Sequence, residues 1–349
     1  MSLKKSKMNS EIIKYVAGAG KTTDSMRFLS EHQNGLYLAF TNSVVDEVCS
    51  KGYLAKTIDS LFFSYIIPKF TSVIPFIASG SKVQYLEKEG TPKTFLGIRN
   101  IHIDAQSGSI LNKDKPTGLS LTNSREILSL NNKPNLHFLR ILFSEQTLYL
   151  TDTLRNELSH YIILHFSAQL MSMIDERFSY VIIDEAQDLN GYKESFAKML
   201  DESNIKVLIL GDNNQNIMGG GGWFELKKPT KVNNESKRSP EPICAWIRDN
   251  LGIEIYGNDE LFGKYFQIEF DNVTDYDDGS RCLLYNSRTK KYAGIIDSWS
   301  GPKATIKSAK GSTIEADIVV IGNVLNKKNF YTALTRTKGN AYSTVSCNQ

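Results

Sequence analysis

Three short stretches of this sequence combine residue types that act on phosphate groups. The first, YVAGAGKT at residues 15–22, has glycines that let backbone N–H groups turn inward around phosphates, a lysine that can neutralise them, and the Thr22 hydroxyl, which can bind Mg²⁺. The pattern G-x-x-x-x-G-K-[ST] asks for glycine where Tyr15 stands. Taken alone, the stretch fits a phosphate-binding loop and an ordinary strand-to-helix turn about equally.

The second stretch is VIIDEAQD at residues 181–188, in which an apolar run is followed by Asp184 and Glu185. An aspartate at the end of a buried strand can hold Mg²⁺, and the adjacent glutamate can polarise the water that attacks a phosphate. A strand that ends in a solvated acidic turn is the alternative. The presence of both signals in one chain, in this order, favours the nucleotide site.

The third stretch, LILGDNNQ, ends on Gln215, whose amide can contact a terminal phosphate or the attacking water. GDNNQ alone is equally a plausible Asx turn. Arg238 and Arg336 lie further along the chain, where an arginine can stabilise charge on transferring phosphates. Taken alone, each arginine is better explained as a surface residue.

Alternating apolar and helical segments are expected to position these stretches. Strands predicted at 12–16, 36–40, 180–183 and 206–211 alternate with helical patterns, one of them starting at Val44 after an Asn42-Ser43 cap. This alternation indicates a parallel sheet with its ligands at the carboxyl ends of the strands. A second α/β series follows residue 240, and there the run FYTAL before Arg336 has a strand-like pattern.

Bulk properties place the chain among ordinary globular proteins. It has 349 residues, 41% of them hydrophobic, and a net charge of +3, which is too small to identify a nucleic-acid-binding protein by itself. The four cysteines form no C-x-x-C pair, so neither a zinc cluster nor a disulfide framework is indicated. No apolar run reaches the length of a membrane span, and the N-terminal lysines precede no apolar segment, so we expect a cytoplasmic protein without membrane contact.

With these residues in place, the chain resembles the superfamily 1 helicases of the UvrD/Rep type. Stretches similar to eight of the family's motifs occur in order: AGAGKTT, YLAFTNSVVDEV, AKTIDSLF, VIIDEAQDL, LGDNNQNI, ESKRSPEPI, TIKSAKGSTIEADIVVI and YTALTRTK. The resemblance implies an α/β P-loop NTPase with two RecA-like parallel-sheet domains. The domains expected are residues 1–63 with 155–232, residues 233–349, and a small inserted accessory subdomain at 64–154.

The resemblance also implies a role for individual residues. ATP contacts are expected from Tyr15, Gly18, Ala19, Gly20, Lys21, Thr22 and Thr23, Mg²⁺ ligands from Thr22 and Asp184, and catalytic roles from Glu185, Gln215, Arg238 and Arg336. Nucleic-acid contacts are expected from Thr41, Asn42, Thr57, Ser60, Phe62, Trp223, Thr305 and Ser308. Phe40 and Phe62 can each stack on a base or belong to the core, and the core is the stronger interpretation for Phe40.

Several departures from the family pattern limit what carries over. Tyr15 replaces the first residue of the loop, and no glutamine-bearing segment precedes the first strand, so adenine selectivity is in doubt. A four-glycine run separates Trp223 from Gln215, and Ser312-Thr313 interrupt the seventh motif, which weakens the assignment of Glu315. Thr305 follows Arg288 closely, which leaves no room for the family's second accessory subdomain.

The resulting prediction is a compact, ATP- and Mg²⁺-dependent translocase or helicase on single-stranded DNA. The resemblance favours 3′→5′ movement, a monomer, and a protein partner for processive unwinding. An RNA helicase is one alternative, because the expected contacts are mostly to the backbone and the 2′-OH separates the two substrates. A nucleotide-dependent regulatory module without unwinding is the other, although the complete set of Glu185, Gln215 and two arginines argues against it.

Overall fold

The computed structural model describes residues 10–32, 34–71, 82–85, 101–103, 109–112, 115–120, 147–150, 152–322 and 325–345. The chain divides into two compact units. Unit 1 contains Met1–Ser10, His32–Ile182 and Asn190–Val207, and unit 2 contains Glu11–Glu31, Ile183–Leu189 and Leu208–Gln349. No helix that the structure describes combines the length and the apolar character that a membrane span requires.

A six-stranded sheet with the order β11-β1-β10-β9-β2-β3 contains the four predicted strands and two short edge strands, β3 and β11, that were not predicted. Its strands are β1 (Ser10–Tyr15), β2 (Gly35–Ala39), β3 (Ala55–Thr57), β9 (Tyr180–Ile183), β10 (Lys206–Gly211) and β11 (Lys231–Asn233). The pairs β1–β11 and β2–β3 are parallel, with Ile13 opposite Lys231 and Tyr37 opposite Ala55. Every residue of β9 is buried, which explains its continuous apolar sequence, because strands covered on both faces do not alternate.

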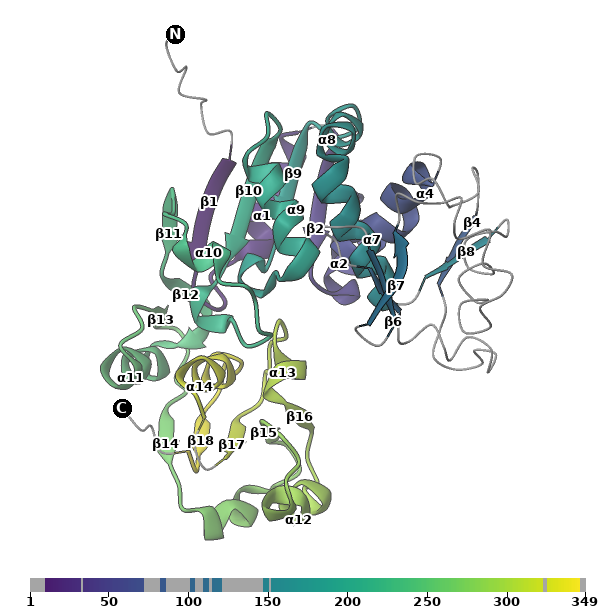
Figure 1. Cartoon of the computed structure of the whole chain (residues 1–349). Coiled ribbons are helices and arrows are strands. Elements are labelled where there is room, and N and C mark those ends of the chain that lie inside the picture. The colour runs from purple at the N-terminus through teal and green to yellow at the C-terminus, as the bar shows by residue number, and fades with distance from the viewer. Residues whose placement is uncertain are drawn as a thin grey trace. The chain divides into compact units, whose positions relative to one another are not determined.

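Helices and short strands complete unit 1 (Figure 1). The helical segments are α2 (Asn42–Ser50), α3 (Ile58–Leu61), the π-helix η1 (Phe62–Ile66), α4 (Ile67–Phe70), α7 (Asp152–His165), α8 (Ser167–Asp175) and α9 (Gly191–Asp201). The short strands are β4 (Lys82–Tyr85), β5 (Ile101–Ile103), β6 (Ser109–Asn112), β7 (Lys115–Ser120) and β8 (Thr147–Leu150). Strands β5, β6 and β7 form an antiparallel sheet, and β4 pairs with β8.

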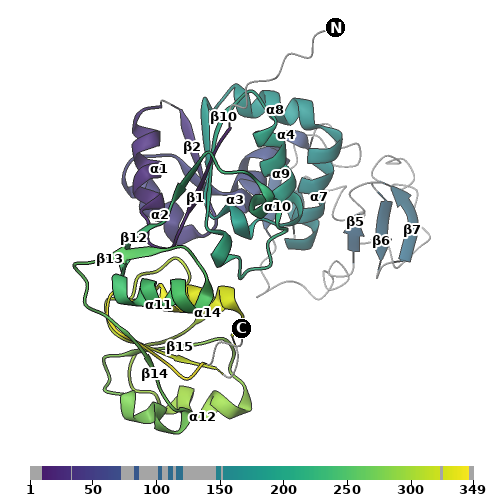
Figure 2. The same ribbon diagram turned by 90° about the vertical axis from the view of Figure 1, so that its left-hand side faces the viewer.

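Unit 2 contains a second sheet with the order β14-β18-β17-β15-β16. Its strands are β14 (Tyr265–Gln267), β15 (Cys282–Tyr285), β16 (Lys303–Thr305), β17 (Ile318–Ile321) and β18 (Ala341–Ser343), and all four pairings are parallel. Figure 2 shows α12 (Lys290–Ser298) on one side of this sheet, and α11 (Glu241–Leu251) and α14 (Lys327–Leu334) on the other. Leu283 and Val319 pack on the α12 side with Tyr292 and Ile296.

Shorter elements of unit 2 connect these parts. They are α1 (Lys21–Ser30), the 3₁₀ turns η4 (Ala186–Asp188), η5 (Asn213–Gln215) and η6 (Phe270–Tyr276), α10 (Trp223–Leu226), β12 (Glu235–Pro240), β13 (Tyr256–Asn258) and α13 (Ile306–Ala309). The parallel sheets confirm the predicted α/β class. Most of the predicted inserted subdomain, residues 64–154, lies outside the described residues, and the domain boundaries stay a prediction.

Two local predictions were wrong. The run FYTAL is part of helix α14, which starts after an Asn326 cap that accepts a hydrogen bond from the Asn329 N–H at 2.7 Å. Residues 330–334 are all buried, and a short run of wholly buried residues has the same apolar pattern in a helix as in a strand. Helix α2 starts at Asn42 with Thr41 as its N-cap, two residues before the predicted start.

Candidate functional site

The glycines of the loop at 15–22 adopt the conformations that a phosphate-binding turn requires. Gly18 and Gly20 have φ angles of 73° and 89°, values that favour glycine strongly. A Cβ atom on Gly18 would lie 2.7 Å from the Cβ of Arg238, so only glycine fits there. Helix α1 starts immediately afterwards at Lys21, and its first N–H groups together with the loop form a cradle that suits an anion.

Tyr15 occupies the end of β1, beneath the loop. Its side chain is 3% exposed, and its hydroxyl donates a hydrogen bond to Asp24 Oδ2 of α1 at 2.9 Å. Burial, and then the contact with Asp24, raises the pKa of Tyr15. These contacts tie the strand to the helix on either side of the loop, and they favour packing over a nucleotide contact as the reason for a tyrosine at this position.

Strand β9 delivers two carboxylates to the loop. Glu185 Oε1 lies 2.7 Å from Lys21 Nζ, and the Glu185 N–H donates to Asp184 Oδ1 at 2.8 Å. Glu185 has a φ of 52°, a strained value for a residue with a side chain, and such strain is often found at functional sites. Burial alone would raise the pKa of Glu185, but Lys21 and then Lys310 hold it well below its usual range. Glu185 is therefore a carboxylate at neutral pH.

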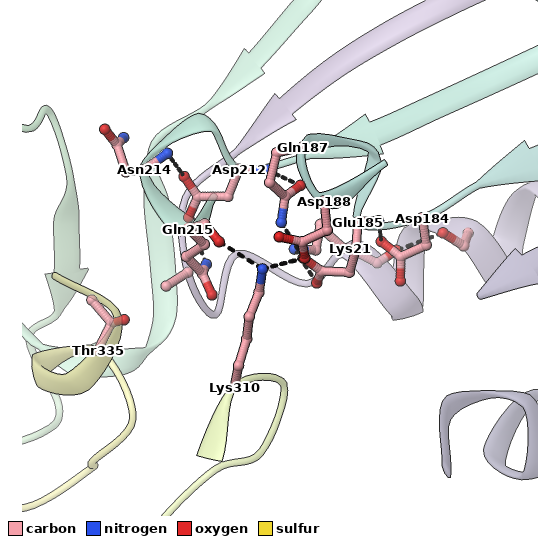
Figure 3. A network of polar contacts seen from close by, with 12 residues as sticks. Lys21, Asp184, Glu185, Gln187, Asp188, Asp212, Asn214, Gln215, Lys310 and Thr335 are labelled. Carbon is pink, nitrogen blue, oxygen red and sulfur yellow. Dashed lines mark hydrogen bonds and ion pairs between the residues drawn. The ribbon is translucent and has the colours of Figure 1, made fainter. Parts of the chain in front are cut away.

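Three residues without a role in the sequence analysis complete this cluster. Lys310 donates to Asp188 and to the main-chain oxygen of Gln215 at 2.6 Å, as Figure 3 shows, and it lies 3.8 Å from Glu185 Oε2. Gln187 donates to Glu185 and accepts the Asp212 N–H at 3.0 Å. Burial raises the pKa of Asp188 to about 6 although Lys310 lowers it. Gln187 and Asp188 lie inside the VIIDEAQDL match, and this match was the sequence feature that could have indicated a role for them.

The end of β10 holds the predicted glutamine in a fixed orientation. Gln215 is 3% exposed, its Nε2 donates to Asp212 Oδ2 at 2.6 Å, and its Oε1 accepts from Arg336 Nη2 at 3.0 Å. Arg336 is 1% exposed, so the surface alternative for this arginine is excluded. Burial, and then the neighbouring Arg238, lowers the pKa of Arg336 to about 9. The structure therefore brings Gln215 and Arg336 together.

Arg238 lies on β12, against the loop. Its Nη1 donates to the main-chain oxygen of Ser312 at 3.2 Å and contacts Thr313 Oγ1 at 3.4 Å, while its buried Nε has no hydrogen-bond partner in the structure. Burial lowers the pKa of Arg238. A buried N–H without a partner, next to a loop shaped for an anion, fits a group that binds a phosphate oxygen.

The oxygen atoms near the loop match what a magnesium ion prefers. Thr22 is on the first turn of α1, and Asp184 and Asp212 are close enough to Lys21 to raise its pKa, although burial would lower it. In the described part of the chain, no group of three or more His, Cys, Asp or Glu side chains is placed to hold a metal. Magnesium in nucleotide sites usually takes only one or two protein oxygens, so the Thr22 hydroxyl and the Asp184 carboxylate fit it.

The candidate nucleic-acid contacts form two similar caps, one in each unit. In unit 1, Thr57 ends β3, and its Oγ1 accepts the Ser60 N–H at 3.0 Å. In unit 2, Thr305 ends β16, and its Oγ1 accepts the Ser308 N–H at 3.0 Å. Strands β3 and β16 are both edge strands. The two Thr-Ile-x-Ser stretches thus adopt the same local structure.

The aromatic candidates differ in exposure. Phe62 is completely buried and packs edge-on against Tyr192 and Phe196 at centroid distances of 5.0 and 5.1 Å, so no base can stack on it. The prediction of Phe62 as a nucleic-acid contact is corrected accordingly. Phe40 is half-buried, with Lys193 Nζ 5.6 Å from its ring centroid, so it is the more accessible of the two phenylalanines.

The remaining candidates lie at the surface or near it. Thr41 and Asn42 are exposed at the start of α2. Trp223 is half-buried at the start of α10, with Lys227 Nζ 5.1 Å from its ring centroid. The Glu315 side chain is 74% exposed and pairs with Lys338 at 2.9 Å. Thr41, Asn42 and Glu315 are therefore exposed, whereas Trp223 is only partly accessible.

The parallel sheets and the loop with its lysine and carboxylates define an α/β nucleotide-binding protein. Residues 102–219 match the UvrD/REP helicase N-terminal domain. Over these residues, the match confirms the resemblance to superfamily 1 helicases of the UvrD/Rep type that the motifs indicated. None of the curated proteins matches the sequence.

Two helicase structures are among the solved structures that match the chain. A PRRSV helicase is 12% identical, with a TM-score of 0.46 over 97% of this chain and 52% of its own. An arterivirus nonstructural protein 10 (helicase) in complex with DNA is 13% identical, with a TM-score of 0.46 over 97% of this chain and 62% of its own. The chain therefore spans less than two thirds of the length of these helicases.

Proposed function

We propose that this protein hydrolyses ATP and uses the reaction to move along a single strand of nucleic acid, with DNA as the main substrate. The observation that carries the proposal is the convergence of four predicted catalytic and binding groups within unit 2. Lys21 contacts Glu185 at 2.7 Å, and Gln215 contacts Arg336 at 3.0 Å. A module that only binds nucleotide needs the loop and its lysine, but has no use for a buried glutamine and arginine pair.

Each group has a chemical role that its surroundings support. Bound ATP with Mg²⁺ would supply a polarised terminal phosphoryl group. Glu185 is ionised at neutral pH and can accept a proton from the attacking water. Gln215 can orient that water, and Arg336 and Arg238 can stabilise charge on the phosphate oxygens. Thr22 and Asp184 would hold the metal.

Lys21 has an alternative partner in this arrangement. Its ammonium group is paired with Glu185, and both side chains are mostly buried, with 13% and 19% exposed. An anionic ligand on the loop would compete with Glu185 for Lys21. Because this exchange frees the Glu185 carboxylate, we propose that ligand binding and activation of the base are linked.

The two Thr-Ile-x-Ser caps support binding to a strand backbone. Each presents a threonine and a serine beside the end of an edge strand, where hydroxyl groups can meet phosphate oxygens. Half-buried Phe40 precedes exposed Thr41 and Asn42, which suits stacking of a base beside a backbone contact. Because backbone contacts and stacking do not depend on which base is present, these contacts favour a single strand of any sequence. The order of motifs favours 3′→5′ movement.

The deciding experiment measures ATP hydrolysis with single-stranded DNA, single-stranded RNA, duplex DNA or no nucleic acid. We expect single-stranded DNA to stimulate hydrolysis most, and Lys21→Ala to abolish it. A strand-displacement assay on substrates with 3′ or 5′ tails tests polarity and unwinding. The assay is run with the protein alone and again with a candidate protein partner. Sedimentation tests for the expected monomer. Hydrolysis that no nucleic acid stimulates would instead support a regulatory module, and stimulation by RNA alone would support an RNA helicase.

A further inference from the structure

Tyr331 of helix α14 is completely buried, and its hydroxyl group joins two parts of the candidate site. The hydroxyl oxygen accepts a hydrogen bond from the Ala17 N–H of the loop at 2.9 Å. The hydroxyl proton is donated to Asp212 Oδ2, also at 2.9 Å. Burial, and then Asp212, raises the pKa of Tyr331 well above its ordinary value, so the hydroxyl keeps its proton at neutral pH.

Asp212 connects Tyr331 to Gln215 through hydrogen bonds. Its Oδ2 also accepts from Gln215 Nε2 at 2.6 Å, and its Oδ1 accepts the Asn214 N–H at 3.0 Å. Asp212 Oδ2 accepts from both Tyr331 and Gln215, so Gln215 turns its NH₂ group toward Asp212 and its oxygen toward Arg336. The orientation of the Gln215 amide is thus set by a chain of contacts that begins at the loop.

Helix α14 also connects Tyr331 to Arg336. Tyr331 lies on α14, and Arg336 follows the helix, with its Nε donating to the main-chain oxygen of Thr332 at 3.0 Å. The hydrogen bond between Tyr331 and Ala17 therefore also fixes the main chain of Arg336 relative to the loop. Phenylalanine would fill the same space but could neither accept from Ala17 nor donate to Asp212.

We propose that Tyr331 is a positioning residue that aligns Gln215 and Arg336 with a nucleotide on the loop. This inference rests on the proposed ATP hydrolysis. Tyr331 acts through Asp212 and through α14, and it holds the two side chains in the arrangement that the transition state needs. It is not required for binding of the nucleotide, because its hydroxyl is already committed to Ala17 and Asp212.

The test compares Tyr331→Phe with Tyr292→Phe, a matched control at another buried tyrosine of unit 2, on the α12 side of the second sheet. Hydrolysis is measured as kcat and KM, and binding is measured with ADP alone and with ADP plus aluminium fluoride, which mimics the transition state. We expect Tyr331→Phe to lower kcat roughly tenfold to a hundredfold, as small misplacements of reacting groups do, with KM and ADP affinity within about threefold. The extra affinity gained with aluminium fluoride should fall by a similar factor.

Three results separate the possibilities. An unchanged kcat and an unchanged preference for the aluminium fluoride complex would overturn the inference. Equal losses in binding of ADP and of the aluminium fluoride complex would assign Tyr331 a structural role only, and would also overturn it. A wild-type protein that does not hydrolyse ATP would overturn the proposed function first.

A second variant pair tests the route through Gln215. If Tyr331 acts through this side chain, Tyr331→Phe should lower kcat much less in a Gln215→Ala background than in the wild type. If the fold-reduction in kcat of the double variant equals the product of the reductions in the two single variants, Tyr331 acts independently of Gln215, which contradicts the proposal. The thermal midpoint of each variant shows whether the comparison is made on folded protein.

Discussion

Replacement of Glu185 by glutamine is the most direct test of the proposed chemistry. Glutamine has the same shape as glutamate and can still accept the hydrogen bond from Gln187, but it cannot take a proton from water. Loss of a general base slows a reaction about 10²- to 10⁴-fold, which corresponds to about 2.7 to 5.4 kcal/mol in the activation barrier. We expect Glu185→Gln to lower kcat within this range.

Nucleotide binding should change in the opposite direction. Glu185 holds Lys21 at 2.7 Å in a mostly buried pair, and the net contribution of such a pair is small because the desolvation of both ions offsets their attraction. Removing the competing carboxylate should therefore leave ADP affinity unchanged or raise it. The combination of slower hydrolysis with equal or tighter binding is a signature that a simple loss of structure cannot produce.

The assay combines steady-state ATP hydrolysis, with and without single-stranded DNA, and titration with a fluorescent ADP analogue. Glu241→Gln serves as the matched control, because Glu241 also pairs with a cation, Arg248 at 2.5 Å, on a different helix of unit 2. Hydrolysis by Glu185→Gln within threefold of the wild type would refute the role of Glu185 as base. Weaker ADP binding by a folded Glu185→Gln variant would refute the competition for Lys21.

Three further predictions address other contacts. Lys310→Met should destabilise the protein by about 3–5 kcal/mol in urea unfolding, because it leaves Asp188 buried without its cation, and a second change to Asp188→Asn should restore most of the loss. Asp59→Asn should cost about 1–3 kcal/mol at pH 7. Burial would raise the pKa of Asp59, but its contacts with Lys193 and then Tyr192 lower it overall. The Asp59 contribution is therefore complete above about pH 4 and is lost as the pH falls through the folded-state pKa, which denaturation at several pH values can show. Phe62→Ala should destabilise the fold by about 3–5 kcal/mol, whereas Phe40→Ala should weaken binding of single-stranded DNA by about 1–3 kcal/mol with little change in stability, and the reverse pattern would contradict the assignment from burial.

Local sequence patterns were sufficient for the parts of the fold that short-range physics controls. The short apolar runs of β9 and β10, each followed by a polar turn, indicated buried strands, and the glycines before Lys21 indicated a tight turn into a helix. The order of these elements also indicated which side chains come close together, because the carboxyl ends of parallel strands share one edge of a sheet. Glu185 beside Lys21 follows from that rule alone.

Other features depend on contacts between residues far apart in the chain. Tyr331 meets Ala17 across 314 positions, and Lys310 meets Asp188 across 122, so the motif matches that contain Tyr331 and Lys310 did not show which residues these side chains contact. The FYTAL run has the same composition in a buried helix as in a buried strand, and only its packing decides between them.

Phe40 and Phe62 also show that a local sequence pattern does not determine how deeply a side chain is buried. Both Phe40 and Phe62 follow short apolar stretches, yet Phe62 is fully enclosed by Tyr192 and Phe196 while Phe40 remains half-buried. The sequence by itself determined the class of fold, and it indicated the loop and the residues that we propose as the base and the two arginines. Only the tertiary structure decided which neighbours hold them in place, because the burial and partners of a side chain depend on elements that the chain brings together from distant positions.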